Sequence, residues 1–208
     1  PDAAPLLAIT LPPDARVLRR APRIRAWLTR HEAKVAGTSV ARRDPWWSLP
    51  IDPARLFLAK AYGPRFVQRL APAPVLADQR VYGIHPRPGI DVTLLAAVLN
   101  ALPTALALES LGRASLGFGA VEWTVRDAHE LPVIDVRRLG DAARVRAALA
   151  AFGTRPIEHV RHERERADRT ELDHAVLDAV SHTAMFDDMW NALLASVALR
   201  DRYLLPPV

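Results

Sequence analysis

The sequence predicts an α+β fold: a small twisted mixed β-sheet with flanking helices and a helical C-terminal tail. Half of the 208 residues are hydrophobic, which is enough for one sizeable core. Short strand-like runs separated by Gly and Pro occupy much of the first half, and apolar residues at helical spacing dominate the second. We therefore expect an extended lead-in at 1–21, an α+β domain at 22–139 and a helical region at 140–208.

Local patterns justify the elements of the first half. Pro22 suits the first turn of a helix, apolar residues recur at helical spacing from Ile24 to Val35, and Gly37 is a natural stop. Strands follow, with Gly and Pro in the turns between them. The predicted strands are 46–49, 55–59, 66–70, 74–76 and 81–85.

Capping residues define the second half. Asp91 can cap a helix that runs to Leu99, and Pro103 can begin another that runs to Leu111. Strands are expected at 120–125 and 132–136. Asp141 can cap the next helix, and two more are expected at 170–180 and 187–202.

Composition excludes several classes of site. The chain has no cysteine, which removes disulfides, thiolate zinc sites and cysteine nucleophiles. The longest apolar run, 94–108, is interrupted by Asn100 and Pro103 and is too short for a bilayer. We therefore expect a cytoplasmic protein with no membrane partner.

The motifs of independent enzymes are also missing from the sequence. No strand, glycine loop and helix follow one another as adenosyl-methionine sites require, and there is no phosphate loop. His159, His162 and Glu163 could share a helix face and bind a metal, but neighbouring arginines would repel a cation, and a solvated helix is the simpler interpretation. We expect no catalytic residue, no metal and no cofactor in this chain.

The charge pattern indicates a polyanionic partner. The net charge is +5. All but two of the 28 basic residues are arginine, which the codon bias of a GC-rich genome would also explain. Residues 16–43 hold nine basic residues and one acid. Residues 155–173 instead mix five arginines with six acids, which predicts a solvated helix with paired charges.

An ordered series of motifs carries a family resemblance. A helix with a His-Glu pair at 31–32 precedes Arg-Asp-Pro-Trp-Trp-Ser-Leu at 43–49, and a strand ending in a basic residue follows at 56–60. The series continues with Ala-Asp-Gln-Arg-Val-Tyr-Gly-Ile at 77–84, a leucine-rich helix that ends in Leu-Asn, Leu-Gly-Arg at 111–113 and Leu-Pro-Val at 131–133. Over roughly residues 20–185 the chain resembles the TaqI-like C-terminal specificity domain of Type II and Type IIG adenine-specific DNA methyltransferases. It departs from the family where Gln79 and Ala101 stand in place of the common Asn and Ser.

The resemblance implies that DNA recognition and methyl transfer are carried out by separate domains. This chain would be the sequence-specific duplex-DNA recognition domain of an adenine-N6 DNA methyltransferase from a restriction–modification system. The catalytic domain, with its S-adenosylmethionine site, would precede it or lie on a separate chain, and would receive the flipped adenine. The partners expected for this chain are then duplex DNA and that catalytic domain.

Residue types in the resembling region suggest the contacts with DNA. Arginine and lysine suit phosphates, and arginine and glutamine can read guanine and adenine edges. Trp46 could stack or wedge at DNA, although at least one residue of the Trp46-Trp47 pair should face the core. The candidate DNA-binding residues are Arg42, Arg43, Trp46, Lys60, Arg65, Gln68, Arg69, Arg80, Tyr82 and Arg113. For each arginine the alternative is an ordinary solvated surface.

Other aromatic and amide residues have structural interpretations. Trp123 and Trp190 lie in apolar periodic contexts and are expected in the core. Asn100, at the end of a buried helix, is expected to satisfy a turn backbone. Two other functions stay open: a scaffold that docks a separate methylase or nuclease subunit through the helical tail, and an enzyme in its own right.

Overall fold

The computed structural model describes residues 11–49, 52–114 and 119–202 and divides into two compact units, Pro1–Asp52 and Pro53–Val208. The division does not fall at 139/140, where the sequence placed a boundary. The helices beyond residue 140 pack on the same core as the strands and the α3–α4 pair, so they belong to one unit. Within both units together the fold is mixed α+β, as predicted.

Unit 1 is helical. A short helix α1 (Ala15–Leu18) is capped by Asp14 and lies within the predicted lead-in, while residues 1–10 are outside the described part. The predicted helix is α2 (Pro22–Val35), with Pro22 in its first turn. A 3₁₀ turn, η1 (Ser39–Arg42), follows, and residues 46–49, expected as a strand, form a turn instead. Leu18 and Leu28 are the only buried residues described in this unit.

Unit 2 begins with the sheet. The central strand β1 (Ala54–Ala59) pairs antiparallel with β3 (Arg69–Val75) and with β4 (Val81–Ile84). A second, two-stranded sheet joins β2 (Ala61–Tyr62) to β5 (Val121–Glu122). Residues 69–70 and 74–75 of two predicted strands lie in the single strand β3, while residues 66–68 and 76 are outside it, and the run 120–125 forms only the short β5. Residues 132–136 form no strand.

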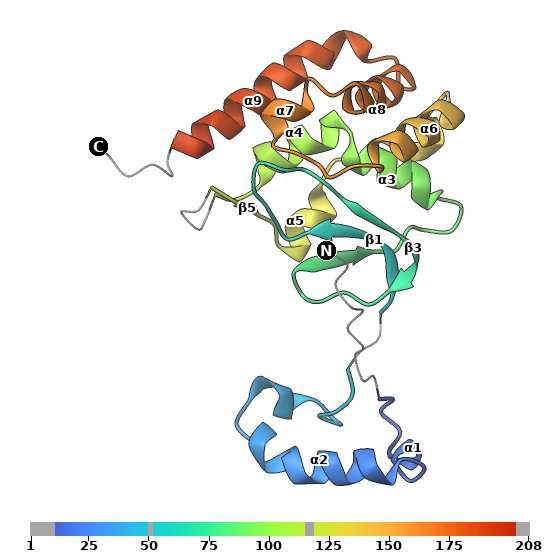
Figure 1. The fold of residues 1–208 in the computed structure, drawn as a ribbon, viewed down its shortest axis with the longest axis vertical. Coiled ribbons are helices and arrows are strands. Elements are labelled where there is room, and N and C mark those ends of the chain that lie inside the picture. The colour runs from blue at the N-terminus through green and yellow to red at the C-terminus, as the bar shows by residue number, and fades with distance from the viewer. Residues whose placement is uncertain (1–10, 50–51, 115–118, 203–208) are drawn as a thin grey trace. The chain divides into compact units, whose positions relative to one another are not determined.

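The helices of unit 2 lie mainly on one side of the three-stranded sheet (Figure 1). The middle layer is α3 (Val92–Asn100) and α4 (Leu102–Leu111). The outer helices include α6 (Ala142–Phe152), α8 (Ala167–Asp178) and α9 (Phe186–Arg202), which pack on α3 and α4. The short helices are α5 (Val125–Glu130), α7 (Val160–Glu163), η2 (Val136–Arg138) and η3 (Thr183–Met185).

Two apolar clusters form the core of unit 2. One joins Leu56 and Leu58 of the sheet to α4 and α9, and includes the buried Trp123 and Trp190, as predicted. The other joins α3, α6 and α8 around Val145 and Leu172.

The junction of α3 and α4 is a sharp bend of 61°. Ala101 is extended there and Pro103 stands in the first turn of α4. No single described helix is long and apolar enough to cross a membrane, and the bent α3–α4 pair meets that criterion only by combined length and composition.

Candidate nucleic-acid interface

The charges of unit 2 are segregated along the chain. Residues 53–90, which form the three-stranded sheet and its turns, carry six Lys or Arg and one acid, Asp78. Residues 91–208 carry thirteen Arg and seventeen acids. The sheet side is therefore basic, and the helical side is acidic. We call residues 53–90 the strand layer.

Ion pairing sharpens this contrast. In the described residues from 91 to 202, eleven of the thirteen arginines form an ion pair, and Arg138 and Arg202 are the exceptions. None of the six cations in the strand layer forms an ion pair with a described residue. Their charge is therefore free to attract an anion, whereas the arginines on the helices are already matched.

Lys60, Arg80 and Tyr82 come together at one end of the sheet. Lys60 N–H donates to the carbonyl oxygen of Arg80 at 3.1 Å, which continues the β1–β4 ladder and sets two cations opposite each other. Like charges at facing positions repel. The Lys60 ammonium lies 4.7 Å from the centre of the Tyr82 ring, and the Tyr82 hydroxyl donates to the carbonyl of Trp123 at 3.0 Å.

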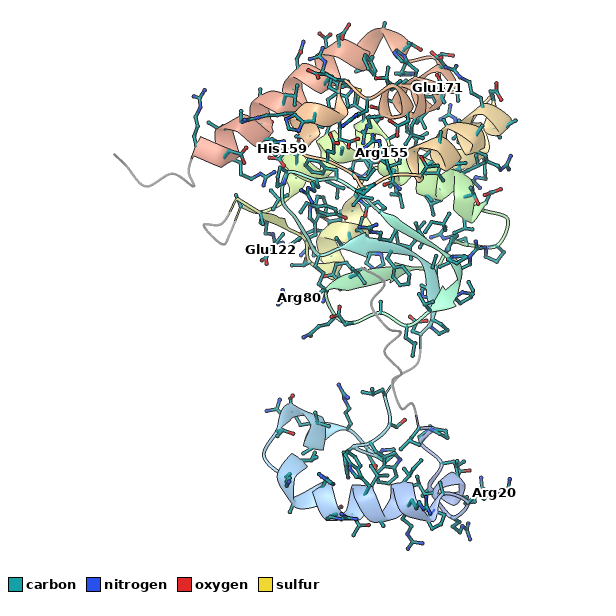
Figure 2. All side chains as sticks on the ribbon, in the orientation of Figure 1. Arg20, Arg80, Glu122, Arg155, His159 and Glu171 are labelled. Carbon is teal, nitrogen blue, oxygen red and sulfur yellow. The ribbon has the colours of Figure 1, made fainter. Side chains whose placement is uncertain are left out.

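Arg65, Arg69 and Arg80 lie on loops or on an edge strand, whereas Arg55 is half-buried on the central strand β1, where its Nε donates to the Ala71 carbonyl at 3.1 Å. Arg80 is exposed in the turn between β3 and β4, where Asp78 accepts the Arg80 N–H at 2.8 Å and fixes the turn. Figure 2 shows Arg80 at the end of unit 2 away from Glu171 and the outer helices. Arg69, exposed on β3, pairs in register with Phe57 and so points to the opposite face from Leu56. Arg65 is exposed in the loop before β3.

Gln68 is not a surface residue. It is only 4% exposed, and its Oε1 accepts the Tyr62 hydroxyl at 2.7 Å. Its backbone N–H donates to Asn100 Oδ1 at 2.8 Å, and Asn100 donates back to the Gln68 carbonyl. Asn100 thus satisfies a backbone, as predicted, while the proposed base-reading role of Gln68 conflicts with its burial. The Tyr62 hydroxyl in this network has a raised pKa because it is buried.

Arg113 is exposed but already engaged. It bridges to Glu122 through backbone hydrogen bonds, and its guanidinium meets Asp127 at 2.7 Å. Asp127 accepts the backbone N–H and the hydroxyl of Thr124 in the capping box of α5, and these contacts, with Arg113, lower its pKa. Arg113 is therefore a weaker anion site than the strand-layer cations.

The remaining candidates belong to unit 1. Arg42 ends η1 and, like Arg43, is exposed. Trp46 and Trp47 are both half-buried, with their rings edge to face at 6.1 Å. The predicted set is thus divided, with Arg42, Arg43 and Trp46 in unit 1 and the other seven in unit 2.

The region 155–173 has the paired charges that the sequence predicted, but it is not one solvated helix: it contains α7 and most of α8, and some of its pairs are buried. Glu163 is buried, and its carboxylate accepts the Arg155 guanidinium at 2.7 Å and the Glu158 N–H at 2.6 Å. Burial also lowers the pKa of His159. The described residues contain no group of three or more His, Cys, Asp or Glu arranged for a metal ion.

Comparisons with known proteins add no relative. No protein-family model matches the chain, and neither the curated proteins nor the solved structures gave a match.

Sequence reasoning missed one exposed aromatic residue. The apolar spacing from Ile24 to Val35 places Trp27 among the residues expected on the buried face of this helix, but Trp27 is 52% exposed on α2. The helical spacing of the basic residues around it could have revealed this position.

Proposed function

We propose that this chain is a duplex-DNA recognition domain, and specifically the target-recognition part of an adenine-N6 DNA methyltransferase from a restriction–modification system. The observation that supports it is the contrast within unit 2: the six cations of the strand layer have no carboxylate partner among the described residues, whereas eleven of the thirteen arginines of residues 91–202 form ion pairs. The family resemblance supplies the methyltransferase class. S-adenosylmethionine and methyl transfer belong, in this proposal, to a catalytic domain outside this sequence.

The strand layer would dock by electrostatics first. Lys60, Arg65, Arg69 and Arg80 would contact phosphates and release the counterions condensed on DNA. Exposed arginine forks next to turns can also read guanine edges in a major groove. Gln68 has no part in this proposal because its amide lies inside the core.

The test is fluorescence anisotropy of labelled duplex DNA with three proteins. These are the wild type, Lys60→Ala/Arg80→Ala, and the matched control Arg126→Ala/Arg161→Ala. Both double variants lose two positive charges, but Arg126 and Arg161 are exposed arginines already paired with Glu130 and Asp201. We expect the first variant to bind duplex DNA at least tenfold more weakly, and the control to bind within about twofold of wild type.

The control also separates the proposal from a scaffold function. A scaffold that docks another subunit would bind DNA only through its net charge, so both variants would lose affinity equally. Equal losses, or no duplex binding by the wild type at low salt, would refute recognition by the strand layer.

A further inference from the structure

A basic and aromatic stripe runs along α2 in unit 1. Arg23, Trp27, Arg30 and Lys34 follow one another at spacings of four, three and four residues. Residues at these spacings lie above one another on one side of a helix. We call these four residues the α2 stripe. Glu32, the only acid of α2, is two residues from Arg30 and from Lys34, and therefore points to the other side of the helix.

The ring of Trp27 is covered by a neighbouring ring on one face and is partly exposed. His31 stacks on it with ring centres 4.2 Å apart and an interplanar angle of 23°. The His31 Nδ1 lies 2.8 Å from the Trp27 carbonyl oxygen, which fixes the imidazole over the indole. The Trp27 side chain is nevertheless 52% exposed. A fixed and exposed indole is a preformed surface for stacking another planar ring.

An aromatic hollow adjoins the stripe. Its volume is about 400 Å³, and three of the five tryptophans in the chain line it. Its lining includes Arg23, Ile24, Trp27, Leu28, Trp46 and Trp47. Trp46 and Trp47 meet edge to face, with an interplanar angle of 79°. The hollow can accept a planar apolar group, and the positively charged Arg23 is one of its lining residues.

The charge around the hollow selects an anionic partner. Among the described residues 11–49 the single ion pair joins Arg16 to Asp14 at 2.9 Å. The other basic residues of this segment are exposed and have no carboxylate partner in the described residues. A partner that offers repeated negative charge together with planar apolar rings is a nucleic acid. In a duplex the base faces are covered by their neighbours, whereas in a single strand they are open to an aromatic ring.

We propose that unit 1 binds single-stranded DNA, stacking an unpaired base against Trp27 at the tryptophan hollow and holding phosphates on Arg23, Arg30 and Lys34. This activity goes beyond duplex recognition and uses none of the strand-layer cations. Stacking on tryptophan tolerates any base, so we expect little sequence preference.

Intrinsic tryptophan fluorescence tests the proposal on the full chain. Trp123 and Trp190 are 3% and 0% exposed, so quenching by a bound base reports on the three tryptophans of unit 1. Titration with a 12-nucleotide oligothymidine should quench the emission. Loss of one stacked base costs about 1–3 kcal/mol, so Trp27→Ala should weaken binding roughly 5- to 150-fold, and Trp27→Phe should keep part of the affinity.

A second pair of variants separates stacking from phosphate contact. Arg30→Ala/Lys34→Ala should weaken binding and reduce its salt dependence, while the control Arg25→Ala, placed on the Glu32 side of α2, should have a much smaller effect. Circular dichroism would check that each variant stays helical. Unchanged affinity in Trp27→Ala, no quenching by the oligonucleotide, or quenching by anionic phospholipid vesicles alone would each refute the proposal.

Duplex binding by the strand layer and single-strand binding by unit 1 can be tested independently of each other. Lys60→Ala/Arg80→Ala should lose duplex binding and keep oligothymidine binding, and Trp27→Ala should do the reverse. Loss of both activities in one of these variants would show a shared surface and overturn the assignment of single-strand binding to unit 1.

Discussion

Single buried residues decide how the helices of unit 2 meet, and Asp173 is the clearest case. It is 0% exposed; its Oδ1 accepts the Leu102 N–H at 2.7 Å, and its Oδ2 accepts the Arg169 guanidinium at 2.9 Å. It therefore caps α4 from α8, across 71 residues of sequence. Its pKa is raised because burial outweighs these contacts. The contacts with Arg169 and Leu102 favour the charged carboxylate and offset part of this cost.

Replacing Asp173 by Ala should therefore be severe. It leaves the buried Arg169 guanidinium and the first turn of α4 without their acceptor, and breaking a buried pair in this way costs about 3–5 kcal/mol. Urea unfolding followed by circular dichroism measures this loss. Glu171→Ala is the matched control, since Glu171 pairs with Arg144 on the surface, where a pair contributes about 0–1 kcal/mol. Similar losses in the two variants would contradict a structural role for the buried pair.

At the residue scale the sequence indicates chemical type but not burial. Gln68 and Arg80 both have side chains that can read a base edge, yet only Arg80 is exposed. The burial of Gln68 depends on Tyr62 and Asn100, and Asn100 is 32 residues away in the sequence. Likewise, no local pattern shows that Asp173 caps α4.

Elements with local causes were predictable. The helix at 22–35 follows from its proline and its apolar spacing, and Asp91 and Asp141 cap α3 and α6 as expected. Strands depend on distant partners. Residues 46–49 and 132–136 have strand composition but form no ladder, because no other strand pairs with them. The predicted sheet was therefore larger than the observed one.

The cap of α3 should make stability depend on pH. Asp91 accepts the Thr93 and Leu94 N–H groups and the Arg146 guanidinium, and these contacts, Arg146 first, lower its pKa below the usual 3.8. The unfolded chain thus binds the proton more readily, so stability from this carboxylate is present above pH 3.8 and is lost as pH falls through the folded value.

Asp91→Asn isolates this contribution. The amide keeps an oxygen to accept the α3 N–H groups but carries no charge for Arg146. Near pH 7 the variant should be less stable than wild type by about 1 kcal/mol, and the difference should shrink as pH falls below 3.8. Urea titrations at several pH values measure it. A difference that is constant across this range would show that the charge of Asp91 contributes nothing.

For the whole molecule, the distribution of unpaired charge is more informative than the total. Neither the net charge of +5 nor the number of arginines shows which surface of the protein would bind an anion. The fold pairs Arg144, Arg155 and Arg200 with carboxylates, whereas the cations of the strand layer have no such partner in the described part of the chain. These partners lie 8 to 91 residues apart, so the sequence predicted a basic surface but not which arginines remain free.

That distribution predicts how salt should act on duplex binding. Each phosphate contact contributes about −0.9 to the slope of log affinity against log salt concentration. Lys60→Ala/Arg80→Ala should therefore make the slope shallower by about 2, because two phosphate contacts are lost. Arg126→Ala/Arg161→Ala should leave the slope unchanged, since those guanidinium groups already have carboxylate partners. Anisotropy titrations over a range of salt concentrations give both slopes. If the two variants show equal slopes, DNA responds to the net charge of the molecule, and the strand layer is not its binding surface.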